Sequence, residues 1–156
     1  MNRAPSGIDR RSPSFVQEIV VAPEEIDELG HVSNIEYVRW IQEVAKAHSR
    51  AVGWTKERYD AAKCVWVVRR HEVEYVWPSY VGERIRLETW VENWRGVSSG
   101  RRTQITRADD GKEIVRANTL WVLVSTVSLK PIRIFGEMHD EFVREPGPDP
   151  TPWRVG

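Results

Sequence analysis

Cysteine is almost absent from this 156-residue chain, which has only Cys64. One thiol excludes an internal disulfide and a zinc site built from several cysteines. Cys64 stands in the apolar run CVWVV, so we interpret it as a small buried residue rather than a nucleophile. Histidines and acids also lack metal-ligand spacing, and no glycine-rich phosphate loop is present. We therefore expect no metal and no separate cofactor.

Neither sign of charge is in excess, because 23 basic residues balance 23 acidic ones. The composition thus gives no support for a nucleic-acid partner or an anionic membrane surface. No segment reaches the roughly 18 consecutive apolar residues of a membrane span. The first residues, MNRAPSGIDRRSPS, lack the apolar core of a signal peptide. These absences lead us to expect a cytoplasmic protein.

The length predicts one domain with a buried core. Residues 1–13 carry arginine, proline and serine without periodicity, so we expect a flexible N-terminal segment. Residues 14–145 form the expected domain, and residues 146–156 are a proline-rich C-terminal tail. The chain also has eight tryptophans, most of them in or near strand-like segments. They could line a pocket, although core packing explains any single one.

A long helix is predicted from Asn34 to Gly53, because apolar residues recur at helical spacing and a glycine ends the pattern. Asn34 fits the N-cap position. Valine-rich or alternating patterns predict strands over residues 14–23, 64–77, 83–94, 96–108 and 113–127, and short helices over 55–62 and 136–143. This order predicts an α+β fold in which a curved antiparallel sheet wraps around one long helix. The open sheet edges favour pairing with a second copy.

An acid, a histidine and an asparagine precede or begin the long helix in the stretch IDELGHVSNIEYVRW, residues 26–40. Such a loop is most often a solvated or capping segment, and His31 can simply hydrogen-bond within it. The start of a helix, however, offers free N–H groups and a positive dipole end. A carboxylate such as Asp27 beside those amides has the parts needed to hydrolyse an activated ester.

The same stretch carries a resemblance to a known family. The chain resembles the hotdog-fold acyl-CoA thioesterases of the 4-hydroxybenzoyl-CoA thioesterase type, over roughly residues 14–143. The most specific part is Asp27-x-x-Gly30-His31-Val32-x-Asn34-x-x-Tyr37-x-x-Trp40. The segments VEYVWPSYVGERIRLETWVENW (73–94) and ANTLWVLVSTVSLKPIRI (117–134) are similar to later strands of the family. Two positions depart from the family pattern, Glu36 and Ser125, where relatives often carry asparagine and aspartate.

The resemblance implies an activity and a set of catalytic residues. The activity is hydrolysis of an acyl-CoA thioester to a free acid and CoA, with CoA as part of the substrate. Asp27 would be the nucleophile or the general base. Asn34 would lie where backbone N–H groups polarise the carbonyl, and His31 would assist with orientation. A second acid, Glu43, lies in the same helix, and we interpret it as structural because Asp27 fits its motif better.

Substrate-binding residues can be nominated from chemistry. Coenzyme A carries several phosphate charges, which favours Arg101 and Arg102 as contacts, with Lys130 and Arg133 next. Tyr37, Trp40 and other tryptophans could line an acyl pocket. His48 and His71 have no supporting pattern and are interpreted as surface or packing residues.

The expected assembly is a homodimer, or a homotetramer formed by two dimers, with active sites at the dimer interface. Two other functions stay open on the same fold. One is a thioesterase that acts on acyl carrier protein, and the other is an acyl-binding module without catalysis. A dehydratase is disfavoured, because the sequence has no histidine and aspartate pair on a hydratase-like segment.

Overall fold

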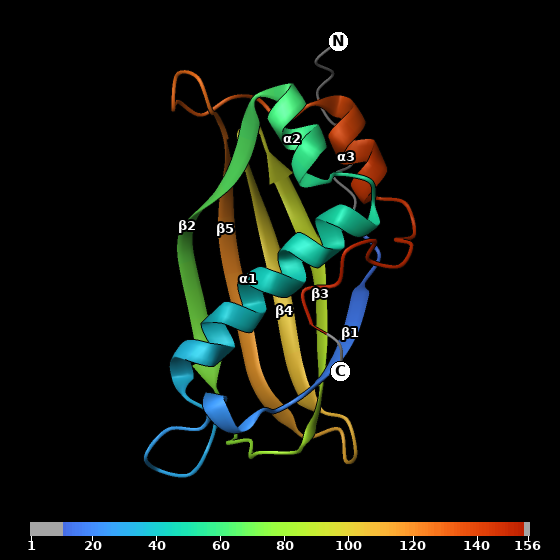
Figure 1. Ribbon diagram of the computed structural model, residues 1–156. Helices are drawn as coiled ribbons and strands as arrows, with labels where there is room; N and C mark the ends of the chain where they lie inside the picture. The colour runs from blue at the N-terminus through green and yellow to red at the C-terminus, as the bar shows by residue number, and fades with distance from the viewer. Residues whose placement is uncertain (1–10, 155–156) are drawn as a thin grey trace.

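The computed structural model describes residues 11–154, which form one antiparallel sheet with a long helix across it (Figure 1). The elements are β1 (Phe15–Val20), η1 (Pro23–Glu25), α1 (Asn34–Ala51), α2 (Lys56–Ala62), β2 (Cys64–Tyr75), β3 (Arg84–Arg95), β4 (Ser98–Arg107), β5 (Glu113–Ser125) and α3 (Gly136–Phe142). The strand order β1-β3-β4-β5-β2 and the single long helix confirm the predicted α+β fold class.

The sheet curves around α1, which crosses its concave face diagonally (Figure 1). The strand register shifts at three places, between Val68 and Arg70, Val91 and Asn93, and Ile105 and Thr106. Such irregularities bend a strand and increase its twist. They therefore allow the sheet to curve into a trough-shaped concave face that holds α1.

Helix α1 is amphipathic and buries one face in this trough. The buried face consists mainly of Tyr37, Trp40, Ile41, Val44, Ala45, Ala47 and His48, which recur at intervals of three or four residues. It packs on alternate residues of the sheet, among them Ile19, Ile85, Leu87 and Ile105. A second apolar cluster, which includes Trp54, Cys64, Trp94 and Phe142, lies where α2 and α3 meet the sheet. Cys64 is buried, as predicted.

The ends of α1 differ slightly from the prediction. Ser33, not Asn34, is the N-cap, because its backbone is extended and its Oγ accepts the N–H of Ile35 at 3.4 Å. The helix ends at Ala51, and Gly53 follows with φ of +97°. That left-handed conformation explains why a glycine stands there.

The C-terminal tail is docked against the domain. Arg50 of α1 makes two hydrogen bonds to Asp149, both at 2.8 Å. Trp153 Nε1 donates to Gln17 Oε1 of β1 at 2.7 Å. Near the other end of the described residues, the Oγ of buried Ser12 accepts the N–H of Val91 at 2.8 Å. Most of the expected flexible segment, residues 1–10, lies outside the described part of the chain.

Within residues 11–154, no helix is long and apolar enough to cross a membrane. The same residues contain no group of three or more histidine, cysteine, aspartate or glutamate side chains that could hold a metal ion.

A buried ion pair between Glu25 of η1 and Arg154 holds the C-terminal tail against the domain. Glu25 is only 6% exposed, and both of its carboxylate oxygens accept hydrogen bonds from Arg154 at 2.6 Å. The indole of Trp40 donates to the same carboxylate at 2.9 Å. Burial by itself would raise the pKa of Glu25, but hydrogen bonds from Arg154, the Ala22 backbone and Trp40 outweigh it and lower that pKa below 4.5.

Replacing Glu25 with Gln should lower the free energy of unfolding by about 1–3 kcal/mol at pH 7, because it leaves Arg154 without its charged partner. The folded-state pKa of Glu25 is depressed, so its stabilising contribution is present above pH 4.5 and is lost as the pH falls through the folded value. The difference in unfolding free energy between the wild type and Glu25→Gln, measured by urea unfolding, should therefore be smaller at pH 3 than at pH 7. Exposed Glu24, changed to Gln, is the matched control. An equal difference at both pH values would contradict the ion pair's role.

Candidate functional site

The loop before α1 is a tight turn that brings Asp27 and His31 face to face. A bridge between Ile26 and Val32 closes the loop, and the Asp27 N–H donates to the His31 carbonyl at 2.9 Å. Gly30 has φ of +88°, a conformation that favours glycine. The glycine in the sequence motif is thus required by the turn.

Asp27 and His31 form a half-buried polar pair. Asp27 Oδ1 accepts the Leu29 N–H at 2.9 Å and lies 3.8 Å from His31 Nδ1. The two side chains are 30% and 31% exposed, respectively. The Asp27 carboxylate is therefore accessible while one of its oxygens is held in place.

Val32 and Ser33 connect this pair to the start of α1. The Ser33 N–H donates to the Glu25 carbonyl at 3.0 Å, which sets the direction in which the helix begins. Asn34 is exposed at the first helical position. The positive end of the helix thus faces solvent beside the Asp27 loop, an arrangement that suits a developing negative charge.

Tyr37 and Trp40 lie in the core directly behind this loop. The Tyr37 hydroxyl hydrogen-bonds to Ser79 Oγ at 2.6 Å. Tyr37 is 2% exposed, and Trp40 is fully buried with its indole on Glu25. Burial raises the pKa of Tyr37, and the carboxylates of Glu83 and Asp27 add to that rise against the Ser79 hydrogen bond.

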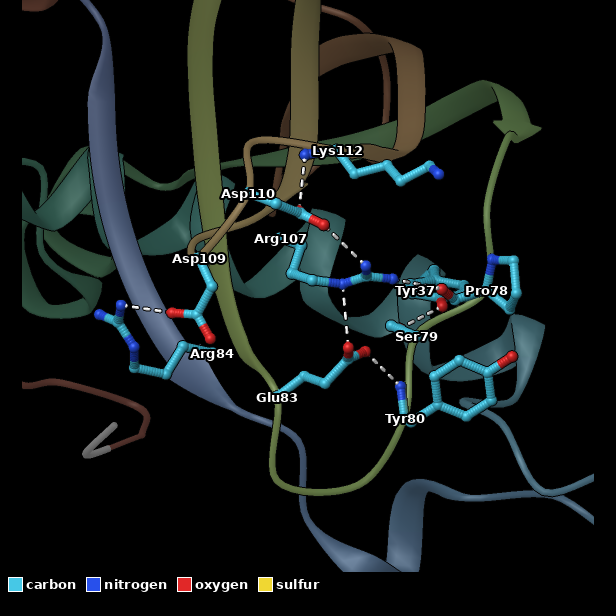
Figure 2. Close-up of polar contacts among 10 residues, drawn as sticks. All are labelled: Tyr37, Pro78, Ser79, Tyr80, Glu83, Arg84, Arg107, Asp109, Asp110 and Lys112. Atoms are coloured by element: carbon cyan, nitrogen blue, oxygen red, sulfur yellow. Dashed lines mark hydrogen bonds and ion pairs between the residues drawn. The ribbon is translucent and has the colours of Figure 1, made fainter.

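Figure 2 shows the loop between β2 and β3, which holds Ser79 against Tyr37. Arg107 of β4 forms an ion pair with Glu83 at 2.9 Å and donates to the Pro78 carbonyl at 3.4 Å. The Ser79 carbonyl accepts the N–H of Val32 at 2.9 Å. This network ties the sheet, the β2–β3 loop and the Asp27 loop into one unit.

A cavity walled by tryptophans lies at the opposite end of α1. Its volume is about 460 Å³, within the usual range for small-molecule sites. Four tryptophans line it: Trp54, Trp66, Trp94 and Trp121. Other lining residues belong to α1, α2, β2 and α3, among other elements. Neither Asp27 nor Tyr37 nor Trp40 lines it. The sequence shows that tryptophans are frequent in the strand-like segments, but only the pairing of the strands brings four of them together at this end of α1.

Arg101 and Arg102 point to opposite faces of the sheet. Arg101 is 6% exposed beneath α1, where its Nη1 donates to His48 Nδ1 at 2.9 Å and to Thr89 Oγ1 at 3.1 Å. Arg102 is exposed on the outer face and lies 3.8 Å from Glu92. Consecutive residues of a strand alternate in direction, and of the two arginines Arg101 lines the tryptophan-walled cavity whereas Arg102 does not.

The remaining nominated residues make local contacts. Glu43 lies 3.5 Å from Lys46 on α1. His71 contacts Thr119 Oγ1 at 2.9 Å, and Lys130 and Arg133 are exposed beyond β5. His48 is fully buried, and burial followed by the Arg101 charge holds its pKa well below 6.5, which makes it a neutral packing residue that accepts from Arg101.

The family assignment follows from sequence comparison. The acyl-ACP thioesterase N-terminal domain family matches residues 13–142. The chain belongs to this family. Oleoyl-acyl carrier protein thioesterase 2 of Arabidopsis thaliana is 23% identical in an alignment of length 145 that covers 88% of this chain and 39% of that protein. The chain thus spans about two fifths of the length of the curated relatives it matches.

Solved structures share the fold. A 1,4-dihydroxy-2-naphthoyl-CoA thioesterase from Synechocystis aligns with a TM-score of 0.76 and 13% identity, over 84% of this chain and 96% of that one. An acyl-ACP thioesterase from Bacteroides thetaiotaomicron aligns with a TM-score of 0.75 and 24% identity, over 92% of this chain and 58% of that one. The predicted hotdog fold is confirmed. Membership of the 4-hydroxybenzoyl-CoA type stays a prediction.

The capping geometry can be tested with two neighbouring residues. Replacing Ser33 with Ala should lower the free energy of unfolding by about 1 kcal/mol, because the Ile35 N–H loses its acceptor. Replacing Asn34 with Ala should leave the stability within about 0.5 kcal/mol, since Asn34 is exposed. Urea unfolding of both variants measures the difference. A larger loss of stability for Asn34→Ala than for Ser33→Ala would show that Asn34, and not Ser33, caps the helix.

Proposed function

We propose that this chain hydrolyses an acyl thioester to a free carboxylic acid and a thiol, working as a dimer. Family membership supports thioester chemistry. A half-exposed carboxylate at a helix start and a tryptophan-lined cavity supply the two parts that such chemistry needs. The observation that carries the proposal is that the cavity lies at the start of strand β2 and the Asp27 loop lies near its end.

Strand β2 runs from the cavity to the neighbourhood of the Asp27 loop. Its first residues, Cys64 to Trp66, line the cavity. Its last residue, Tyr75, packs on Tyr37 with ring centroids 6.0 Å apart. The β5 strand covers only one edge of β2 in the described sheet.

Antiparallel pairing of two β2 edges would join the separated parts. A two-fold axis through the middle of β2 brings the start of one strand beside the end of its partner. The cavity of each copy would then adjoin the Asp27 loop of the other. Exposed apolar side chains at both ends of β2 favour such burial, among them Val65, Val67, Val76 and Trp77.

The reaction needs few groups, because a thioester is already activated. Asp27 either attacks the carbonyl carbon to form a mixed anhydride or takes a proton from an attacking water. The carbonyl oxygen becomes negative and is stabilised by N–H groups at the start of α1 near Asn34. The carbon–sulfur bond then breaks, and the thiolate leaves and is protonated. In the covalent route a water molecule then hydrolyses the mixed anhydride, which releases the free acid and regenerates Asp27. His31, 3.8 Å from Asp27, orients the carboxylate.

The thiol of the donor is either coenzyme A or the phosphopantetheine of acyl carrier protein. Sequence resemblance to acyl-CoA thioesterases favours CoA, and membership of the acyl-ACP thioesterase N-terminal domain family favours the carrier protein. The same acyl group offered on both donors separates them through kcat/KM. Binding of acyl groups without turnover of either donor would instead identify an acyl-binding module.

Replacing Asp27 with Asn should lower kcat/KM by at least about 100-fold, because Asn can neither attack nor accept a proton from water. Asn keeps an oxygen for the Leu29 N–H, so folding should be unchanged. Release of free thiol from acyl-CoA or acyl carrier protein measures the rate. Exposed Glu28, changed to Gln, is the control. A fully active Asp27→Asn variant would remove Asp27 from the mechanism.

The shared site can be tested by mixing two inactive variants. Asp27→Asn removes the acid, and Ala45→Phe fills the cavity that Ala45 lines. Equal mixing with subunit exchange should restore roughly a quarter of wild-type activity, because half of the dimers then contain one intact site. Mixing the Asp27→Asn protein with itself is the control. No recovery despite proven exchange would mean that each copy uses its own cavity.

A further inference from the structure

Arg101 carries a buried charge that no acidic side chain of residues 11–154 neutralises. Arg101 is only 6% exposed, and among residues 11–154 no carboxylate lies within ion-pair distance of it. Its two recorded partners, His48 and Thr89, are neutral. Burial lowers the pKa of Arg101 to about 10, so the guanidinium is still charged at neutral pH.

The Arg101 guanidinium also has N–H donors that make no hydrogen bond within the described residues. Both recorded bonds use Nη1. The Nε and Nη2 edge has three further N–H groups, and within the described residues none of them has a protein acceptor. This edge is the one with which arginine binds a carboxylate through two parallel hydrogen bonds.

Arg101 lines the tryptophan-walled cavity, and it is the cation of this lining that has no acidic partner among residues 11–154. The three other cations of the lining are each paired with an acid: Lys46 with Glu43, Arg50 with Asp149 and Lys56 with Asp60. Asp60 is 64% exposed and is already paired with Lys56 at 2.7 Å. A second buried donor, the indole N–H of Trp121, lacks a partner in the described part of the chain.

We propose that this cavity binds a hydrocarbon chain or ring that ends in a carboxylate, with the carboxylate on the Nε and Nη2 edge of Arg101. The tryptophans would cover the apolar body of the ligand, and the guanidinium would neutralise its end. The carboxylate comes either from the far end of an acyl group or from the free acid that hydrolysis releases. The first source rests on the proposed function, since it makes the ligand part of a thioester substrate.

Binding of simple acids tests the site without requiring turnover. Octanoate and octanedioate should quench or shift the tryptophan fluorescence of the wild-type dimer at concentrations at least ten times lower than octan-1-ol or octanamide does. These ligands share the chain and differ in charge. Equal affinity for the neutral and charged ligands would overturn the proposal.

Two arginines of one strand provide matched variants. Arg101→Leu should abolish the preference for charged ligands while octan-1-ol still binds, and Arg101→Lys should retain part of it. Arg102→Leu, on the outer face, should bind like wild type. If Arg101→Leu does not fold, the comparison of Arg101→Lys with the wild type decides. Equal loss of all ligands in a folded Arg101 variant would assign Arg101 a purely structural role.

Turnover then distinguishes the two sources of the carboxylate. If the acyl group supplies it, the mono-CoA thioester of octanedioic acid should have a lower KM than octanoyl-CoA, and Arg101→Leu should reverse that order. If the released acid supplies it, both thioesters should have similar KM values and octanoate should inhibit the wild type more than Arg101→Leu. The Asp27→Asn variant should bind all acids normally. Failure of the hydrolysis proposal would therefore leave the binding result intact.

Discussion

The burial of α1 in a curved sheet is the constraint on which the rest of this structure depends. An amphipathic helix of this length can hide its apolar face only if the sheet bends to follow it, and three shifts of strand register provide the bend. The helix is 18 residues long, or about 27 Å. That length separates the Asp27 loop at its start from the cavity at its end.

The separation has a direct consequence for chemistry. A carboxylate and an apolar cavity that lie at opposite ends of one helix cannot act on the same short substrate within one copy. Strand β2 runs between the same two ends and has one open edge in the described sheet. The open edge and the divided site are the two observations that support the proposed antiparallel pair of copies. The hotdog fold by itself does not decide this, because a fold can carry many functions.

Two buried charges in the molecule have opposite surroundings. Glu25 accepts hydrogen bonds from Arg154, Trp40 and a backbone N–H, so its charge is fully compensated. Among the residues that the structure describes, Arg101 meets only neutral acceptors, His48 and Thr89. A charge that is removed from water without a counterion destabilises a fold unless something else offsets it. Glu25 is thus part of the architecture, whereas the surroundings of Arg101 leave room for an anion.

Much of the fold and part of the site were predictable from local patterns. The alternation of the strands, the helical spacing after Asn34 and the glycine turn before it depend on neighbours a few residues away, so the sequence by itself determined these elements. The resemblance carried by the Asp27 motif also pointed to the hotdog thioesterases. Which end of α1 holds the cavity, the inward direction of Arg101 and the docking of Arg154 on Glu25 were decided only by the tertiary structure. Each depends on which strands pair and in which register, and residues that are neighbours in space there are more than fifty positions apart in the chain.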